Sequence, residues 1–149
     1  MNDIERTSPI GLVRYAKDFF DVALAANDVI GKRKGYEITA PIPVMFLIAH
    51  SIELALKAYL RYAGTSLDDL KKLSHNLCEC WLKAIDSGIE KYVTLTKEDL
   101  GVLKIISDLH TSTELRYIRT GFKRFPVFSS LEVLARKLLD VICPLVGYK

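Results

Sequence analysis

The expected fold of this chain is organised around residues 41–64, PIPVMFLIAHSIELALKAYLRYAG. Its apolar residues lie nearly all round a helical projection, which is typical of a helix buried at the centre of a domain. Proline at two early positions favours a helix start at one of them, and Gly64 ends the pattern. The length would serve to cross a membrane, but titratable side chains interrupt it, and such groups are costly in hydrocarbon. We therefore expect a central helix and no membrane partner; the interrupting residues are His50, Glu53, Lys57 and Arg61.

Helical patterns continue on both sides of this stretch. A first helix is expected to begin at Ser8 and Pro9, a cap residue followed by proline, and to run to about Ile30. A polar turn at residues 65–69 then leads into a helix at about residues 75–87, which Asn76 or the competing cap Ser74 would open.

The C-terminal half predicts two more helices. Thr96 followed by Asp99 resembles a capping box, so a helix is expected to start there and continue through His110. A last helix is expected at roughly residues 130–143, with Pro144 as its stop. Residues 92–95 have strand-forming character, but we discount a strand because it would have no partner. The expected fold class is all-α, an up-and-down bundle of four to five helices.

Length and composition indicate one globular domain over residues 1–149. Half of the residues are apolar and 26% are charged, which excludes a disordered chain. The formal net charge of +3 does not by itself indicate a nucleic-acid partner. The N-terminal sequence shows no secretory signal and the three cysteines are an odd number, so a reducing, cytoplasmic location is expected.

The sequence predicts no metal or cofactor site. Cys78 and Cys80 are two residues apart, so a helix turns them to opposite sides, and together with His75 they cannot surround one ion while that segment is helical. Small buried apolar groups are the expected role of these thiols. Phosphate-loop, dinucleotide-binding, zinc-protease and nucleophile-elbow patterns are all missing from the sequence.

A polar stripe marks the central helix. Four residues, His50, Glu53, Lys57 and Arg61, fall within about 80° of one another around the axis. Glu53 and Lys57 have the favourable order for an intrahelical ion pair, and Arg61 is expected at the solvent edge. His50 and Glu53 are expected to be partly buried and to hydrogen-bond to another helix or to each other. Two interpretations stay open: the stripe fastens helices together, or it forms the wall of a site.

The other two histidines also allow a structural and a functional interpretation. His75 stands at a predicted helix start, where its ring would anchor the preceding loop or act beside Glu53 and Lys57 as a general acid or base. His110 shares a stripe with apolar residues, so a core-facing, hydrogen-bonded ring is expected, with a catalytic role as the alternative.

A basic and aromatic segment lies between the last two predicted helices. It contains four cations and three aromatic residues without a carboxylate. Cations neutralise phosphates and aromatic rings stack on unpaired bases, so the segment is typical of single-strand binding; a solvated loop whose rings pack on the bundle is the alternative. Its members are Arg116, Tyr117, Arg119, Phe122, Lys123, Arg124 and Phe125.

Three motifs together resemble the HEPN superfamily, the helical "higher eukaryotes and prokaryotes nucleotide-binding" domains. They are the His50-x-x-Glu53-x-x-x-Lys57 helix, the SHNL helix start at residues 74–77, and the LRY segment at residues 115–117. The resemblance spans about residues 44–122, and the flanking helices fit the same bundle. It implies a HEPN-like fold for the whole chain.

The family implies two kinds of activity. Many members are metal-independent endoribonucleases that act as dimers, with an arginine that holds the phosphate four to six residues before a histidine that moves the 2′-OH proton. No arginine here precedes a histidine at that spacing; His110 and Arg116 occur in the reverse order, so the catalytic pair is not carried over. Other members bind nucleotide, RNA or protein, often as partners of a small nucleotidyltransferase.

We therefore expect a HEPN-like module that binds single-stranded RNA or nucleotide and forms a homodimer through apolar helix faces. One alternative is an endoribonuclease of toxin or defence type that uses Arg116 with His110 or His75; another is a protein-interaction partner of a nucleotidyltransferase. The expected groove residues are His50, Glu53, Lys57, His75, Arg116 and Tyr117, with Arg119, Lys123 and Arg124 gripping phosphate.

Overall fold

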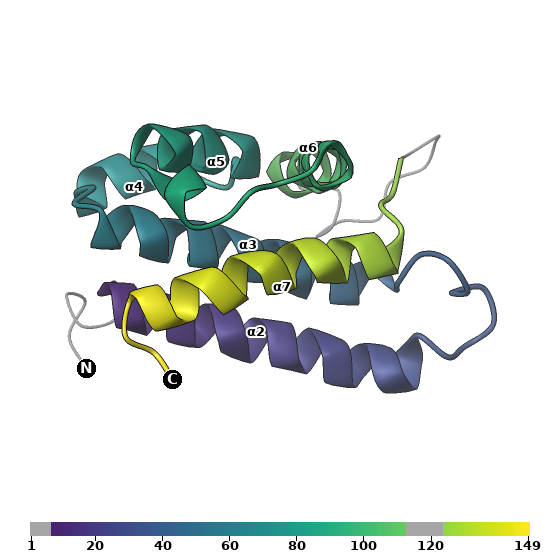
Figure 1. Cartoon of the computed structure of the whole chain (residues 1–149). Coiled ribbons are helices and arrows are strands. Elements are labelled where there is room, and N and C mark those ends of the chain that lie inside the picture. The colour runs from purple at the N-terminus through teal and green to yellow at the C-terminus, as the bar shows by residue number, and fades with distance from the viewer. Residues whose placement is uncertain (1–6, 113–123) are drawn as a thin grey trace.

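The computed structural model describes residues 7–112 and 124–149, and these residues form helices with no strand among them. Three long helices, α2 (Pro9–Ile30), α3 (Ile42–Tyr62) and α7 (Phe128–Leu145), run lengthwise side by side (Figure 1). Two short helices, α4 (Leu67–Leu73) and α5 (Leu77–Asp86), cover one end of α3. Helix α6 (Lys97–Thr111) crosses the other end and is viewed nearly along its axis, after a 3₁₀ turn at Ile89–Lys91. The expected all-α bundle is confirmed.

Helix α3 is the centre of this bundle, as its composition predicted. It contacts α2, α4, α5, α6 and α7, so nearly every side of it meets another helix. It is long and apolar enough to cross a membrane, yet 61% of its most apolar window is buried inside the protein. That burial is what a core helix requires.

Helix α2 begins and ends where the sequence predicted. The Ser8 hydroxyl caps it by accepting a hydrogen bond from the backbone N–H of Gly11 at 3.0 Å. On α3, the buried Ser51 hydroxyl donates to the carbonyl of Ala16 at 2.6 Å and ties the two helices together. The buried face of α2 holds Leu12, Val13, Ala16, Phe20 and Ala23.

Helix α4 occupies part of a segment, residues 65–69, for which the sequence predicted a polar turn. The hydroxyl of Ser66 accepts from the N–H of Asp69 and starts the helix one residue later. Leu70 is buried against the bundle, which holds this seven-residue helix in place. Asn76 caps α5 as predicted, whereas Ser74 adopts φ 51° and ends α4 rather than opening α5.

The last two helices follow the prediction with one shift. The capping box of Thr96 and Asp99 is present at the start of α6, with both reciprocal hydrogen bonds. Helix α7 begins at Phe128, two residues earlier than expected, and passes through Pro144 to Leu145. Pro144 has no backbone N–H, so it cannot donate to the carbonyl four residues earlier. Only Leu145 follows it in α7, so the helix ends one residue beyond the expected stop.

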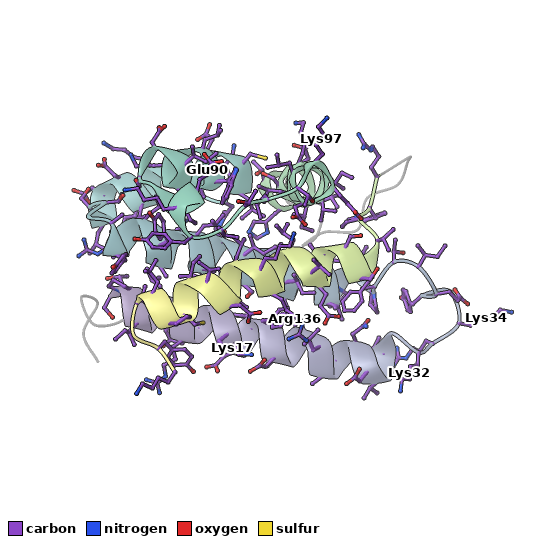
Figure 2. All side chains as sticks on the ribbon, in the orientation of Figure 1. Lys17, Lys32, Lys34, Glu90, Lys97 and Arg136 are labelled. Atoms are coloured by element: carbon purple, nitrogen blue, oxygen red, sulfur yellow. The ribbon has the colours of Figure 1, made fainter. Side chains whose placement is uncertain are left out.

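Charged side chains stand mainly on the outside of the bundle. Lys32 and Lys34 project from the loop after α2, and Lys97 stands at the start of α6 (Figure 2). Two carboxylates are exceptions, because Glu53 and Asp99 are buried with relative exposures of 3% and 4%. Asp99 pairs with Lys137 and so joins α6 to α7, while Glu53 lies at the polar stripe of α3.

Candidate functional site

The buried carboxylate of Glu53 is the centre of a polar cluster. Its Oε2 atom pairs with Nζ of Lys57, one turn later on α3, at 3.0 Å. Its Oε1 atom is contacted by Nδ1 of His75 at 2.9 Å and by Nε2 of His110 at 2.8 Å. Three segments that are distant in the sequence therefore meet at one side chain, which we call the Glu53 cluster: Glu53, Lys57, His75 and His110.

The loop between α4 and α5 delivers His75 to this cluster. Ser74 takes a positive φ and its carbonyl oxygen accepts a hydrogen bond from Nζ of Lys57, which fixes the loop onto α3. The carbonyl of His75 also accepts from the hydroxyl of Thr111 at 3.3 Å. The His75 side chain is 42% exposed, so it forms the solvent edge of the cluster.

His110 is the buried edge of the cluster. It lies near the end of α6 and is 1% exposed, which confirms the expected core-facing, hydrogen-bonded ring. Because an ionised carboxylate only accepts, the hydrogen that His110 donates to Glu53 is on Nε2. Its Nδ1 atom is buried without a hydrogen-bond partner within residues 7–112 and 124–149.

The cluster keeps Glu53 ionised. Burial alone raises the pKa of this carboxyl group because it removes water from the charged form. The hydrogen bond from His110, the positive charge of Lys57 and the hydrogen bond from His75 outweigh burial and lower the pKa to about 2. Glu53 is therefore a charged acceptor at neutral pH, and its partners both neutralise and orient it.

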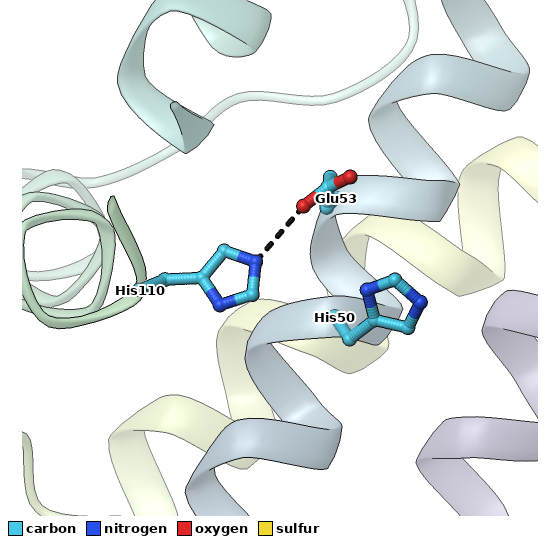
Figure 3. A group of neighbouring side chains, drawn as sticks. All are labelled: His50, Glu53 and His110. Atoms are coloured by element: carbon cyan, nitrogen blue, oxygen red, sulfur yellow. Dashed lines mark hydrogen bonds and ion pairs between the residues drawn. The ribbon is translucent and has the colours of Figure 1, made fainter. Parts of the chain in front are cut away.

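His50 stands one turn before Glu53 on α3 and next to the cluster (Figure 3). Its ring packs edge-on against Phe19 of α2, with ring centroids 4.7 Å apart, and stacks on Phe46 at 6.2 Å. Its centroid is 6.4 Å from that of His110. All three histidines of the chain are thus gathered around Glu53.

A groove of about 400 Å³ opens beside the cluster, between the start of α2, α3 and α4. Glu53 and Lys57 form part of its wall, so Lys57 belongs to both the cluster and the groove. Lys71 of α4 supplies a second cation, and leucine side chains supply most of the rest. The lining residues are Thr7, Leu12, Glu53, Leu54, Lys57, Leu67, Leu70 and Lys71.

Two other predicted residues that the structure describes, Arg61 and Arg124, are not part of this arrangement. Arg61 is partly buried and donates to the carbonyl of Thr65, beyond the end of α3, at 3.1 Å. Arg124 is exposed on the segment before α7. Four predicted groove or phosphate-binding residues lie outside the described residues: Arg116, Tyr117, Arg119 and Lys123.

Sequence reasoning missed the α4 side of the groove. The signal was present, because Ser66 followed by Asp69 is a helix-start pattern and leucines recur at residues 67, 70 and 73.

The cysteines behave as expected: Cys80 is buried, and burial raises the pKa of its thiol to about 12, while Cys78 is half-buried. The Cys80 thiol therefore stays protonated at neutral pH and is not a nucleophile in this setting.

Comparison of the chain with protein-family models, with curated proteins and with solved structures finds no match. Functional inference therefore rests on the Glu53 cluster, the groove and the sequence motifs.

Proposed function

We propose that this chain is a HEPN-like module that binds single-stranded RNA or a nucleotide in the groove beside Glu53. The composition of the groove carries the proposal: two lysines stand among leucine walls in a space of about 400 Å³. Ammonium groups pair with phosphate oxygens, and apolar walls accommodate a sugar or the face of a base. The resemblance to HEPN domains supports the same class of ligand.

The charges in the groove favour an anion. Lys57 is matched by Glu53, which leaves Lys71 as the cation whose charge faces a ligand. Lys71 is exposed on α4, so it can meet a phosphate without losing a buried partner. The basic and aromatic segment at residues 116–125 follows α6 in the sequence and supplies the additional cations and stacking rings that a longer strand needs.

Adjacent lysines on α4 provide a matched test. Lys71 lines the groove, whereas Lys72 does not and instead lies 3.5 Å from Asp69. Binding of a labelled single-stranded RNA is measured by fluorescence anisotropy over a range of salt concentrations. We expect Lys71→Glu to weaken binding about tenfold and to make the salt slope shallower by about 0.7 for each lost phosphate contact. Lys72→Glu is expected to have a smaller effect on both quantities.

Two further results decide the proposal. A mononucleotide that competes with the RNA places both ligands in the same groove, and the double variant Arg119→Glu/Lys123→Glu is expected to weaken RNA binding further. Absence of binding, a salt-independent signal, or equal losses for Lys71→Glu and Lys72→Glu would contradict the proposal.

A second candidate function is metal-independent RNA cleavage, and one observation favours it. Glu53 holds Nδ1 of His75 at 2.9 Å while the ring is 42% exposed, so Nε2 is the nitrogen left to exchange a proton with a substrate. Such a base takes the proton of a 2′-OH, whose oxygen attacks the adjacent phosphorus. The bond from phosphorus to the 5′-oxygen of the next nucleotide breaks, and that oxygen takes up a proton from water to leave as a 5′-hydroxyl. By the HEPN resemblance, Arg116 would hold that phosphate.

Cleavage is tested with end-labelled single-stranded RNA in EDTA. If the chain is a ribonuclease, it leaves 2′,3′-cyclic phosphate ends, and both His75→Gln and Arg116→Ala abolish the products. Retardation of the RNA without cleavage supports the binding module alone. Cleavage that survives both substitutions would exclude this mechanism.

A further inference from the structure

The three histidines of this chain come from three different segments and meet at one buried carboxylate. His50 and Glu53 are three residues apart on α3, so they project from the same face of the helix. His110 approaches from α6 (Figure 3). A ligand atom from each of His50, Glu53 and His110 lies within 4.8 Å of the other two. Imidazole nitrogens with a carboxylate oxygen are the donor set of divalent transition metals.

The distances are close to those of a metal centre. Bonds of about 2.0–2.1 Å in tetrahedral geometry hold neighbouring ligand atoms about 3.3 Å apart. Nε2 of His110 is now 2.8 Å from Oε1 of Glu53, so the two groups need to separate by only about half an ångström to admit an ion between them. The ligand atoms of the three residues all lie within 4.8 Å of one another, so the pair that is farthest apart closes by at most about 1.5 Å.

We propose that His50, Glu53 and His110 form a binding site for a divalent transition-metal ion, with Zn²⁺ as the principal ion. The surroundings fit the role of outer partners. Lys57 holds Oε2 of Glu53, and a carboxylate oxygen has two lone pairs, so Oε1 keeps its hydrogen bond from His75 while it binds the ion. His110 binds through Nε2 once its hydrogen moves to Nδ1.

The charge balance around the ion determines which ligand takes the remaining coordination position. Lys57 already matches the negative charge of Glu53, so the ion adds positive charge that no described neighbour of the cluster balances. Three protein ligands leave a coordination position open, which is typical of zinc sites that bind a water or a substrate. We expect that position to take hydroxide or a phosphate oxygen. The site therefore goes beyond the RNA- or nucleotide-binding groove and does not depend on it.

The test uses metal-free full-length protein titrated with Co²⁺, whose visible absorption reports four- or five-coordinate geometry. We expect one Co²⁺ per chain, displaced by Zn²⁺, and a rise in the unfolding temperature with Zn²⁺. His50→Gln is expected to abolish the absorption, whereas the matched control His75→Gln retains it. Circular dichroism checks that both variants are folded.

A measurement on the wild-type chain removes the dependence on variants. In ¹H–¹⁵N spectra of the imidazole rings, Zn²⁺ is expected to shift the nitrogens of His50 and His110 strongly and those of His75 weakly. The proposal is overturned if the wild type gives no Co²⁺ absorption, if folded His50→Gln binds as the wild type does, or if the ion shifts His75 instead of His50. None of these readouts involves RNA, so failure of the metal site leaves the binding groove to be judged by its own test.

Discussion

The Nε2 atom of His110 lies 2.8 Å from Oε1 of Glu53, although 57 residues separate them in the sequence. This contact joins α6 to the central helix α3 and, together with His75, keeps a buried carboxylate ionised. The same carboxylate is paired with Lys57 and forms part of the groove wall. Helix packing and the candidate site therefore depend on one side chain.

Replacement of Glu53 by glutamine is expected to destabilise the protein. The glutamine side chain would retain the shape, but the loss of charge leaves Lys57 without its counterion and weakens two hydrogen bonds from histidine. Breaking a buried ion pair by removing one partner costs about 3 kcal/mol of unfolding free energy. Urea unfolding followed by circular dichroism measures the change, and Glu79→Gln, at an exposed position of α5, is the control, with a change within about 0.5 kcal/mol. Equal losses in the two variants would contradict a stabilising role for the Glu53 cluster.

The buried carboxylate of Asp99 is expected to make the unfolding free energy fall at acid pH. Burial raises the pKa of this carboxyl group, but the hydrogen bonds from Lys137 and Thr96 lower it further than burial raises it. The folded state therefore binds its proton at lower pH than the unfolded chain, so the stabilisation is complete above about pH 4 and is lost as the pH falls below that value.

Asp99→Asn removes this contribution. We expect lower stability at pH 7 and a shallower decline of stability as the pH falls below about 4, because fewer protons are taken up on unfolding. Urea unfolding at a series of pH values measures both effects. If the unfolding free energies of the variant and the wild type fall equally steeply with decreasing pH, Asp99 is not the source of the pH dependence.

Two glycines are expected to respond oppositely to replacement by alanine. Gly88 has φ +94° at the turn where the hydroxyl of Tyr59 donates to the carbonyl of Ser87 at 2.7 Å. A side chain in that left-handed conformation costs about 1–2 kcal/mol, so Gly88→Ala is expected to destabilise. Gly101 is an exposed helical residue with open space around its Cβ position, and Gly101→Ala is expected to stabilise by about 0.5–1 kcal/mol. Thermal unfolding of both variants decides the signs.

The outer face of α2 predicts self-association. Tyr15, Val22 and Val29 are 45%, 55% and 73% exposed and recur every seven residues, so they form one apolar line on the outer face of α2, which we call the α2 seam. An antiparallel pairing of two copies sets Arg14 of one α2 opposite Asp28 of the other, twice by symmetry. We propose that the chain forms a homodimer through this face.

A charge placed in the seam tests the dimer. Val22→Glu lies near the two-fold axis, where it would face its own copy, and is expected to give a monomer in light scattering coupled to size-exclusion chromatography. Val133→Glu, at a valine of α7 that is 48% exposed, is the matched control and is expected to remain dimeric. A monomeric wild type, or loss of the dimer in both variants, would exclude the α2 face.

Local sequence patterns account for the helices and for most of their ends. Caps are local, because Ser8, Asn76 and Thr96 each bond to a backbone N–H three residues later, and the apolar pattern of α3 marked it as central. The sequence also placed Glu53 and Lys57 on one stripe, since four residues make about one turn.

Tertiary structure alone decided what the stripe contacts. Nothing local indicates that His75 and His110 meet on the same oxygen of Glu53, because that depends on how α4, α5 and α6 pack on α3. The short helix α4 forms because Leu70 is buried against its neighbours, whereas seven residues are too few for a helix stable on its own. Helix boundaries follow from nearest neighbours in the chain; the site follows from which faces are buried together.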